Sequence, residues 1–349
     1  MKANLWRIIP VSAVAVAVAL AGCGQPGTHG RTADRPSAAH PATVRPSATR
    51  PAAARSSATH RVAAPSAATH PATARPATAK MLLGVFERGA EASYQRVDKF
   101  AATVGRRPDV VVSFAVWGRP FDASFAGIAH AHGARLLIQL EPVHASVASI
   151  AAGRSDKYLR SYATAVRKFG HPVILSFAPE FNGPWYPWGW TRSPPATWKA
   201  AWRHVVKLFR KRGASNVTWQ WTVNRRFTGS GPLPRYWPGS GYVDWVGIDA
   251  YYIHHYDTFA TVFAPTLNDV RRITGKPVLI SETAVGQVAG RTRAIPDLFA
   301  GTIRRHLRGL VWFDMDQDRG IYHQNWRLEG HPAAIAAFRR GLASWKSRA

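Results

Sequence analysis

The fold is decided by residues 173–181, VILSFAPEF, in which a short and almost continuous apolar run ends at a proline and a glutamate. Runs of this kind recur after residue 80, and stretches with amphipathic helical spacing, clearest over residues 198–209, separate them. Apolar strands that alternate with helices indicate a parallel sheet with both faces buried. The predicted strands are Met81–Phe86, Val110–Trp117, Arg135–Leu140, Val173–Phe177, Val217–Val223, Val243–Ile248, Pro277–Ile280 and Leu310–Phe313.

Eight such units between residues 81 and 349 predict an α/β fold, the (β/α)8 TIM barrel, whose usual size is about 250 residues. An open, doubly wound sheet is the competing architecture. It is disfavoured because no glycine-rich phosphate loop follows any predicted strand, and the turn GVFE at residues 84–87 lacks the dinucleotide fingerprint. We therefore expect one catalytic barrel domain over residues 81–349.

The residues before this domain have a different composition. Residues 1–23 combine two basic residues with an apolar run that is too short to span a bilayer, which is typical of a signal peptide. The run ends in LAGC, which resembles a bacterial lipobox and implies cleavage before Cys23 and lipidation of its thiol. Residues 24–80 are rich in Ala, Pro and Thr and cannot form a core, so we predict a disordered linker. Together these features predict a protein that is lipid-anchored on the extracellular face of the bacterial cell membrane.

The charge of the chain is strongly positive. Its 349 residues carry 46 Lys and Arg against 19 Asp and Glu, a formal net charge of +27, which first suggests a nucleic-acid partner. However, the basic residues are spread over the linker and the expected outer helices, whereas aromatic residues cluster beside carboxylates that would repel phosphate, so we predict no nucleic-acid partner. The single cysteine, Cys23, excludes an intramolecular disulfide. We expect no cofactor and a monomer.

Acidic residues stand at the carboxyl ends of the predicted strands, which is where a TIM barrel carries its chemistry. Glu180 follows the fourth strand and Glu282 follows the seventh. Two carboxylates across a cleft can catalyse glycoside hydrolysis, one as the acid and the other as the nucleophile or the base. We predict that these two are the catalytic pair. Glu87 and Glu141, at the ends of the first and third strands, are the alternative carboxylates, and Glu141 is a candidate ligand of a substrate hydroxyl.

An aromatic loop follows the first glutamate of this pair. Residues 182–190, NGPWYPWGW, hold four aromatic residues that Pro and Gly keep out of a regular helix or strand. Such rings suit stacking on sugars, although aromatic side chains are more often buried, so we expect some to pack inward and at least one to line the cleft. Candidate substrate-binding residues are Trp117, Glu141, Asn182, Trp185, Trp188 and Asn224.

The same region resembles a known family. Residues 176–189, SFAPEFNGPWYPWG, resemble the acid/base segment on the fourth strand of glycoside hydrolase family 26. Residues 244–252, DWVGIDAYY, and 277–282, PVLISE, resemble the family's sixth and seventh strands. The resemblance covers about residues 81–330 and implies a retaining barrel glycosidase of clan A, with β-mannanases, β-glucanases and xylanases as relatives.

The resemblance also implies a role for each matching residue. Glu180 would be the general acid/base and Glu282 the nucleophile, Tyr251 would donate a hydrogen bond to the nucleophile, and Trp312 would stack on the sugar at the cleaved bond. Pro179 departs from the pattern, because characterised mannanases typically have His before the acid/base. Proline cannot donate a hydrogen bond, which counts against mannan. The predicted function is a retaining hydrolase of β-linked polysaccharide, similar to an endo-β-1,4-mannanase or a β-glucanase.

A non-catalytic carbohydrate-binding barrel at the cell surface is the alternative function. Pro179 supports it, whereas the two intact glutamates oppose it. His254 and His255 follow the sixth strand, but a third ligand with usable geometry is not evident, so we predict no metal site. The run DMDQD at residues 314–318 lacks the glycine and distal glutamate of a calcium loop, and we interpret its acids as loop residues.

Overall fold

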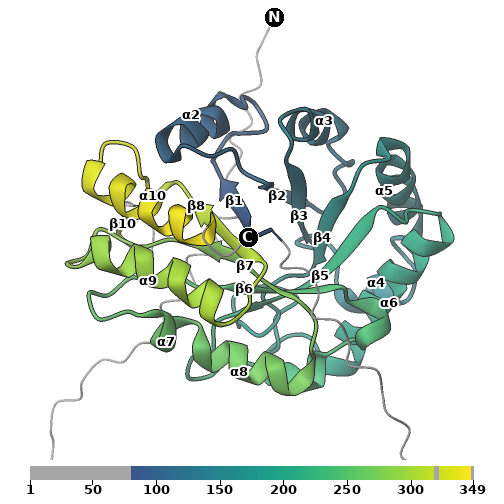
Figure 1. The fold of residues 1–349 in the computed structure, drawn as a ribbon. Helices are drawn as coiled ribbons and strands as arrows, with labels where there is room; N and C mark the ends of the chain where they lie inside the picture. The colour runs from purple at the N-terminus through teal and green to yellow at the C-terminus, as the bar shows by residue number, and fades with distance from the viewer. Residues whose placement is uncertain (1–79, 318–321, 347–349) are drawn as a thin grey trace, which may run out of the picture. The chain divides into compact units, whose positions relative to one another are not determined.

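Eight parallel strands pair in chain order and close into a barrel, with the last strand hydrogen-bonded to the first (Figure 1). The computed structural model describes residues 80–317 and 322–346, so the predictions for residues 1–79, which include Cys23, lie outside it. The barrel strands are β1 (Leu82–Phe86), β2 (Val110–Val116), β3 (Arg135–Glu141), β4 (Val173–Phe177), β5 (Val217–Asn224), β6 (Trp245–Asp249), β7 (Val278–Thr283) and β8 (Gly309–Phe313). The predicted (β/α)8 TIM barrel is therefore confirmed.

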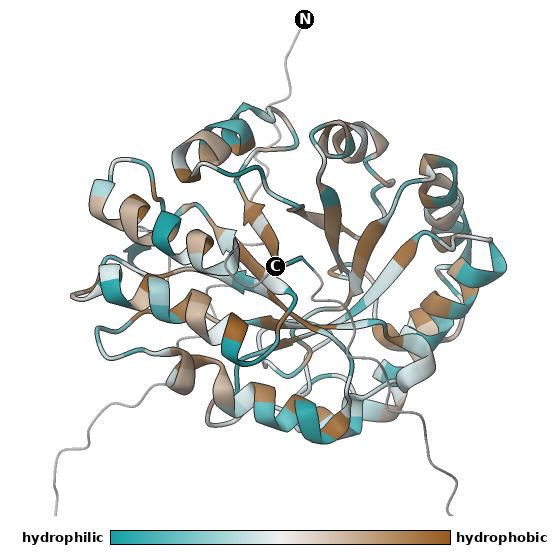
Figure 2. Cartoon of the chain, viewed as in Figure 1, coloured by the Kyte–Doolittle hydropathy of each residue, from teal (hydrophilic) through white to brown (hydrophobic). Residues whose placement is uncertain are grey.

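Helices surround the barrel, and their apolar faces are turned toward the strands (Figures 1 and 2). The helix α6 illustrates why, because its predicted apolar positions over residues 198–209 are fully buried while Lys and Arg lie between them. The helices are α2 (Gln95–Val104), α3 (Ala123–Ala131), α4 (Val147–Ala151), α5 (Asp156–Phe169), α6 (Pro195–Lys211), α7 (Phe259–Val262), α8 (Ala264–Ile273), α9 (Arg291–Arg304) and α10 (Pro332–Lys346).

Shorter elements decorate the loops at the ends of the strands. They are the 3-10 helices η1 (Leu233–Tyr236) and η2 (Ser240–Tyr242) and the two-residue strands β9 (Asp316–Gln317) and β10 (Gln324–Asn325), which pair antiparallel after β8. Within residues 80–317 and 322–346, no helix has both the length and the apolar character that a membrane span requires.

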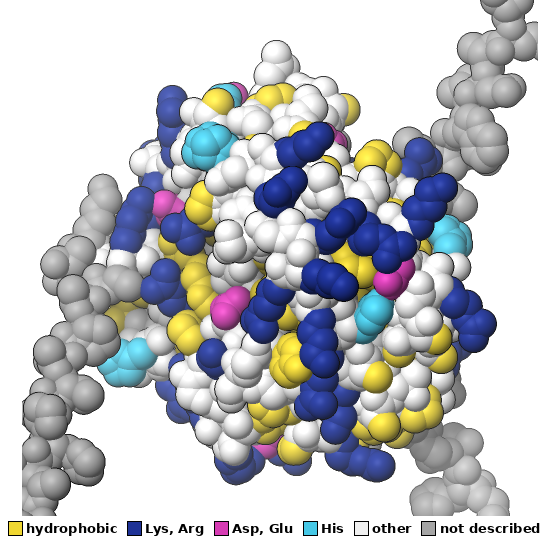
Figure 3. Space-filling model, turned by 90° about the vertical axis from the view of Figure 1, so that its right-hand side faces the viewer, with side chains coloured by type: hydrophobic (Ala, Val, Ile, Leu, Met, Phe, Trp, Pro, Cys, Tyr) yellow, Lys and Arg dark blue, Asp and Glu magenta, His cyan; other side chains and the backbone are white. Residues whose placement is uncertain are grey.

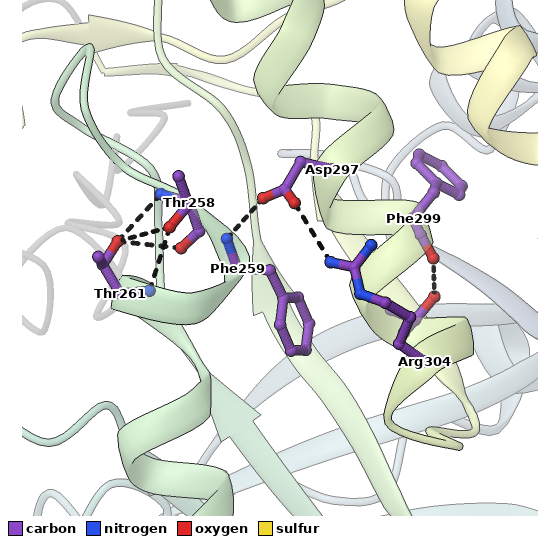
Figure 4. A network of polar contacts seen from close by, with 7 residues as sticks. Thr258, Phe259, Thr261, Asp297, Phe299 and Arg304 are labelled. Atoms are coloured by element: carbon purple, nitrogen blue, oxygen red, sulfur yellow. Dashed lines mark hydrogen bonds and ion pairs between the residues drawn. The ribbon is translucent and has the colours of Figure 1, made fainter.

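The loop after β6 is held by polar contacts to α9 (Figure 4). Thr258 and Thr261 form a capping box at the start of α7. The next backbone N–H, that of Phe259, donates to Asp297 Oδ2 at 2.6 Å, and the other oxygen of Asp297 accepts from Arg304 at 3.3 Å. The carboxylate therefore satisfies a backbone donor that has no partner within the helix, and it fixes the end of this loop.

Candidate active site

The backbone after β4 makes an unusual turn that carries Glu180. Ala178 and Glu180 have φ values of 47° and 52°, in the left-handed region that side-chain-bearing residues rarely adopt. The barrel hydrogen bonds nevertheless continue on both sides, because Ala178 N donates to Leu140 O and Glu180 N donates to Thr222 O, both at 3.0 Å. In addition, Pro179 O accepts a 2.7 Å bond from the Trp188 indole. Strain held this firmly is typical of functional sites.

Two side chains donate hydrogen bonds to the Glu180 carboxylate. Asn224 Nδ2 donates to Oε1 at 2.5 Å and Trp185 Nε1 donates to Oε2 at 3.0 Å. Asn182 holds Asn224 in place, since its amide accepts from the Asn224 backbone N–H at 2.8 Å and donates to the Asn224 carbonyl at 2.9 Å. The structure thus brings three of the predicted residues to Glu180, and it gives Asn182 a positioning role because the amide is occupied by the backbone.

A β-bulge on β7 sets the position of Glu282. Ile280 pairs with Ile248, but Glu282 pairs with Asp249, so Ser281 is an extra residue in the ladder. Ser281 Oγ donates to Asp249 Oδ1 at 2.5 Å. A bulge next to a site re-aims the following side chain, and here that side chain is Glu282.

The Glu282 carboxylate accepts hydrogen bonds from two further strands. Tyr251, which follows β6, donates its hydroxyl to Oε2 at 2.8 Å. Gln139 of β3 makes a longer contact, with Nε2 at 3.5 Å from Oε1. The tyrosine is fixed in turn by Trp326, whose ring stacks on it with centroids 4.3 Å apart and an interplanar angle of 8°.

Three carboxyl groups meet at the ends of β4, β6 and β7. One carboxylate oxygen from each of Glu180, Asp249 and Glu282 lies within 4.8 Å of the others. Carboxyl groups about 5–5.5 Å apart are found in retaining glycosidases, whereas inverting enzymes need about 6.5–9.5 Å. Glu180 and Glu282 each keep 8% of their surface exposed, while Asp249 has none. The two glutamates are therefore the members of the cluster that solvent reaches.

Burial controls the protonation of this cluster. It raises the pKa of Glu180 to about 7, although the hydrogen bonds from Asn224 and Trp185 lower it in part. Burial also raises the pKa of Glu282 well above its ordinary value, and the charge of Glu180 adds to that rise. Asp249 shifts in the same direction, first by burial and then by the charges of both glutamates. At neutral pH the cluster therefore retains a proton for a general acid, while the hydrogen bond from Tyr251 lowers the pKa of Glu282 in part and favours its ionised form.

The same three carboxyls are also the group, within the described part of the chain, that could hold a metal ion. His254 and His255 are not in that group. Instead, Asp257 accepts the backbone N–H groups of Ile253 and His254 at 2.7 and 2.8 Å, so this acid shapes the turn after β6.

Glu141 lies behind the aromatic loop. It is fully buried, and it accepts a 3.3 Å hydrogen bond from the hydroxyl of Tyr186, whose ring stacks on Trp188 at 4.1 Å. Burial raises the pKa of Glu141 to about 8. Trp188 is also almost entirely buried. The structure therefore contradicts direct substrate contact by Glu141 and Trp188, because both are covered by the protein, and it assigns them to the support of the loop.

The predicted stacking role of Trp312 is wrong. Its ring has no exposed surface and packs at 5.2 Å against Phe338 of α10, on the outer side of the barrel. Side chains alternate along a strand, so the next residue, Phe313, faces the other way and lies 5.8 Å from Tyr251. Trp117 likewise packs outward, against Tyr158 of α5 at 4.9 Å, and not beside the catalytic pair.

Several residues of the site were not predicted from the sequence. They are Gln139, Asp249, Tyr186 and Trp326. Asp249 and Tyr186 lie inside the motifs at residues 244–252 and 182–190, so their neighbours gave a signal. Gln139 is the one amide side chain in an otherwise largely apolar strand, and its polarity is the sequence feature that could have indicated a role in the site. Trp326 lies in an irregular loop and reaches Tyr251 only through the tertiary fold.

A closed (β/α)8 barrel with two solvent-reachable carboxyls at the ends of β4 and β7 is the arrangement found in TIM-barrel glycoside hydrolases. Comparison with known proteins agrees with that class. The model of the family "Glycosyl hydrolase family 26" matches residues 146–326, and the chain belongs to this family.

Relatives of this chain are mostly longer proteins. Endoglucanase H of Acetivibrio thermocellus is 29% identical over 276 residues, which are 74% of this chain and 30% of that protein. Beta-1,3-xylanase TXYA of a Vibrio species is 31% identical over 108 residues, which are 30% of this chain and 22% of that protein. The chain thus spans less than a third of the length of either relative.

Solved structures with the same fold include two mannanases. A double mutant of the Cellulomonas fimi endo-beta-1,4-mannanase has a TM-score of 0.58 at 17% identity, with 76% of this chain and 71% of that chain covered. A GH26 beta-mannanase from Bacteroides ovatus has a TM-score of 0.57 at 15% identity, with 76% and 89% covered. At these identities the likeness concerns the fold.

Proposed function

We propose that this protein is a retaining hydrolase of a β-linked polysaccharide and that it works by double displacement. The observation that carries this proposal is the separation of the Glu180 and Glu282 oxygens, within 4.8 Å, combined with the hydrogen bond from Tyr251 to Glu282. That separation leaves no room for a water between carboxylate and sugar, which favours direct attack by a carboxylate.

In the first step, a Glu282 oxygen attacks the anomeric carbon while the glycosidic C–O bond breaks. The Glu180 proton passes to the leaving oxygen, so the released chain leaves as an alcohol. In the second step, Glu180 takes a proton from water, the resulting oxygen attacks the anomeric carbon, and the bond to Glu282 breaks. Tyr251 steadies the carboxylate charge on Glu282 before attack and after release.

For the substrate we propose β-glucan ahead of β-mannan. Pro179 offers no hydrogen-bond donor beside the acid/base, and its carbonyl is already bound by Trp188. Endoglucanase H, whose match covers 74% of this chain, carries the name of a glucan hydrolase. Incubation with a panel of mixed-linkage β-glucan, cellulose, β-mannan and xylan tests this order, because analysis of the released products shows which polysaccharide is cleaved.

Two variants test the mechanism. Glu282→Ala abolishes turnover, and Glu180→Gln lowers kcat by about 10²–10⁴-fold because the proton donor is lost. Glu329→Gln changes an exposed glutamate, so it is the matched control and keeps full activity. Proton NMR of the first product shows retained anomeric configuration. Inverted product, or unchanged hydrolysis by the Glu282 variant, overturns the mechanism, and binding without hydrolysis of any panel member supports the carbohydrate-binding alternative.

We also propose that the protein is anchored through lipidated Cys23 on the extracellular face of the membrane. The lipobox-like sequence at residues 20–23 and the lone cysteine support this proposal. Labelling of cells with a radioactive fatty acid tests it. We expect label on the wild type and none on Cys23→Ala, which is released from the membrane fraction. Equal membrane retention of both forms contradicts the anchor.

A further inference from the structure

The surface formed by α5 and α6 carries an excess of positive charge. The two helices hold nine Lys or Arg residues against one acid, Asp156. By contrast, α2 and α8 each carry two basic residues and one aspartate. On the face of the molecule that presents α5 and α6, the Lys and Arg side chains gather in a band (Figure 3). The helices α9 and α10 each carry three basic residues and at most one acid, so the excess is not confined to α5 and α6, but this pair holds the largest part of it among the described helices.

A groove lies within this basic surface. It has a volume of about 460 Å³, and its lining includes Lys157, Arg160, Lys168 and Arg212 but no acidic residue. Ser161 is exposed and adds a hydroxyl to the lining. The groove combines side chains from one face of α5 with Arg212, the residue directly after α6, so the packing of the two helices sets where the four basic side chains begin.

The charges in the groove are largely uncompensated. Arg160 makes a 3.1 Å ion pair with Asp156, whose other oxygen binds His204 at 2.6 Å. Within the described part of the chain, Lys157, Lys168 and Arg212 form no ion pair, and all three are exposed. Like charges gathered on two adjacent helices repel each other, and an anion in the groove relieves that repulsion.

The surroundings of the groove restrict the kind of anion. The large apolar side chains exposed in the described residues are Ile128 and Tyr256, and neither lies on α5 or α6. The lining of the groove itself holds no aromatic ring on which a nucleic-acid base can stack. It also offers no cluster of apolar side chains for insertion into a membrane. A flexible polyanion that needs only charge and hydroxyl contacts is the partner that fits.

We propose that this groove binds an anionic glycan, a sugar polymer with carboxylate groups, at a site separate from the glutamate pair. Arg guanidinium groups bind carboxylates with two parallel hydrogen bonds, Lys supplies point charges, and Ser161 suits a sugar hydroxyl. None of the lining residues belongs to the catalytic cluster. The site goes beyond the proposed function, since it concerns where the enzyme is held and not which bond it cleaves.

Binding of the full-length chain to polygalacturonate tests the proposal. Lys157→Glu/Lys168→Glu/Arg212→Glu reverses three groove charges, and the triple Gln variant removes them with less disturbance. The matched control, Arg107→Glu/Arg293→Glu/Arg340→Glu, makes the same change in net charge at exposed arginines outside α5 and α6. Affinity is measured by calorimetry at several salt concentrations, together with the melting temperature and the hydrolysis of a soluble substrate for every variant.

We expect the groove variants to bind polygalacturonate at least about tenfold more weakly than the control variant, and added salt to weaken binding by the wild type. Hydrolysis of the soluble substrate stays unchanged in all of them. Equal losses in the groove and control variants overturn the proposal, because net charge then explains the binding. Tighter groove-dependent binding of single-stranded DNA or of anionic vesicles overturns the assignment to a glycan, and so does equal binding of neutral galactomannan.

Discussion

The buried pair formed by Glu87 and Asp314 makes a pH-dependent contribution to stability that a single substitution can isolate. These residues follow β1 and β8, and each keeps only 6% of its surface exposed. The Glu87 carboxyl hydrogen-bonds to Asp314, whose Oδ1 also accepts the Leu328 backbone N–H at 2.8 Å. Two carboxyls in such contact share a proton, with Glu87 as the donor. Glu87→Gln replaces that protonated acid with an amide that donates the same bond and cannot ionise.

The size of the effect follows from the pKa of Glu87, which burial and the charge of Asp314 raise from 4.5 to about 9. Folding therefore favours the protonated form. The stabilisation that this gives is complete below about pH 4.5, where the unfolded chain is protonated too, and it is lost as the pH rises through 9. One proton corresponds to a slope of about 1.4 kcal/mol per pH unit. Between pH 5 and pH 8 the free energy of unfolding of the wild type thus falls by up to a few kcal/mol relative to that of the Gln variant.

Urea unfolding at each pH from 5 to 9 measures this difference. We expect the free energies of unfolding of the wild type and Glu87→Gln to be similar at pH 5 and to diverge steadily above it, in favour of the variant. Glu329→Gln is the control, because the bond from Lys99 lowers the pKa of Glu329 and leaves it ionised throughout this range. The difference in free energy of unfolding between Glu329→Gln and the wild type is therefore the same at every pH of the series. Parallel curves for the wild type and Glu87→Gln would refute the shared proton.

Three further predictions concern the site and its support. Tyr251→Phe removes the donor to Glu282 and lowers kcat about 10- to 100-fold at an unchanged melting temperature, which raises the activation free energy by about 1.5–3 kcal/mol. Wild-type values of kcat in steady-state kinetics contradict this role. The wild-type kcat/KM falls as the pH rises through about 7, because Glu180 then loses the proton it must donate; a profile that stays flat to pH 9 contradicts the assignment. Asp297→Ala exposes the Phe259 N–H and lowers the free energy of unfolding by about 1 kcal/mol in urea titration, whereas Asp297→Asn keeps most of it.

The strands and the catalytic pair were predictable because their signals are local. A buried parallel strand reads as an apolar run, and the barrel places the end of every run at one mouth, so Glu180 and Glu282 could be brought together without coordinates. The same reasoning predicted all eight strands to within a few residues. In the aromatic loop at residues 182–190, Trp188 is buried and Trp185 donates to Glu180, whereas a ring that lines the cleft stays a prediction.

The errors arose where one residue of register decides which way a side chain points. Trp312 and Phe313 are both large and aromatic, and a shift of one position exchanges the ring that faces the barrel interior with the ring that faces α10. The bulge at Ser281 likewise changes the direction in which the Glu282 side chain points, and no sequence feature of that strand predicts the bulge. Trp326 was missed for a different reason, because a loop residue that reaches Tyr251 across the barrel mouth has no sequence pattern.

The electrostatics of the site and of the outer surface are opposite, and this contrast explains how a basic protein can serve as a glycosidase. Burial is the main cause of the raised pKa of Glu282, and the charges of Glu180 and Glu141 add to it, so each buried carboxyl disfavours ionisation of the others. The transition state of glycoside hydrolysis places positive charge on the sugar ring. Any negative charge that the carboxyls carry is costly in the empty, buried site, and the positive charge of the transition state offsets that cost. The raised pKa values and the expected catalysis therefore have one cause, the burial of three carboxyls at the ends of β4, β6 and β7.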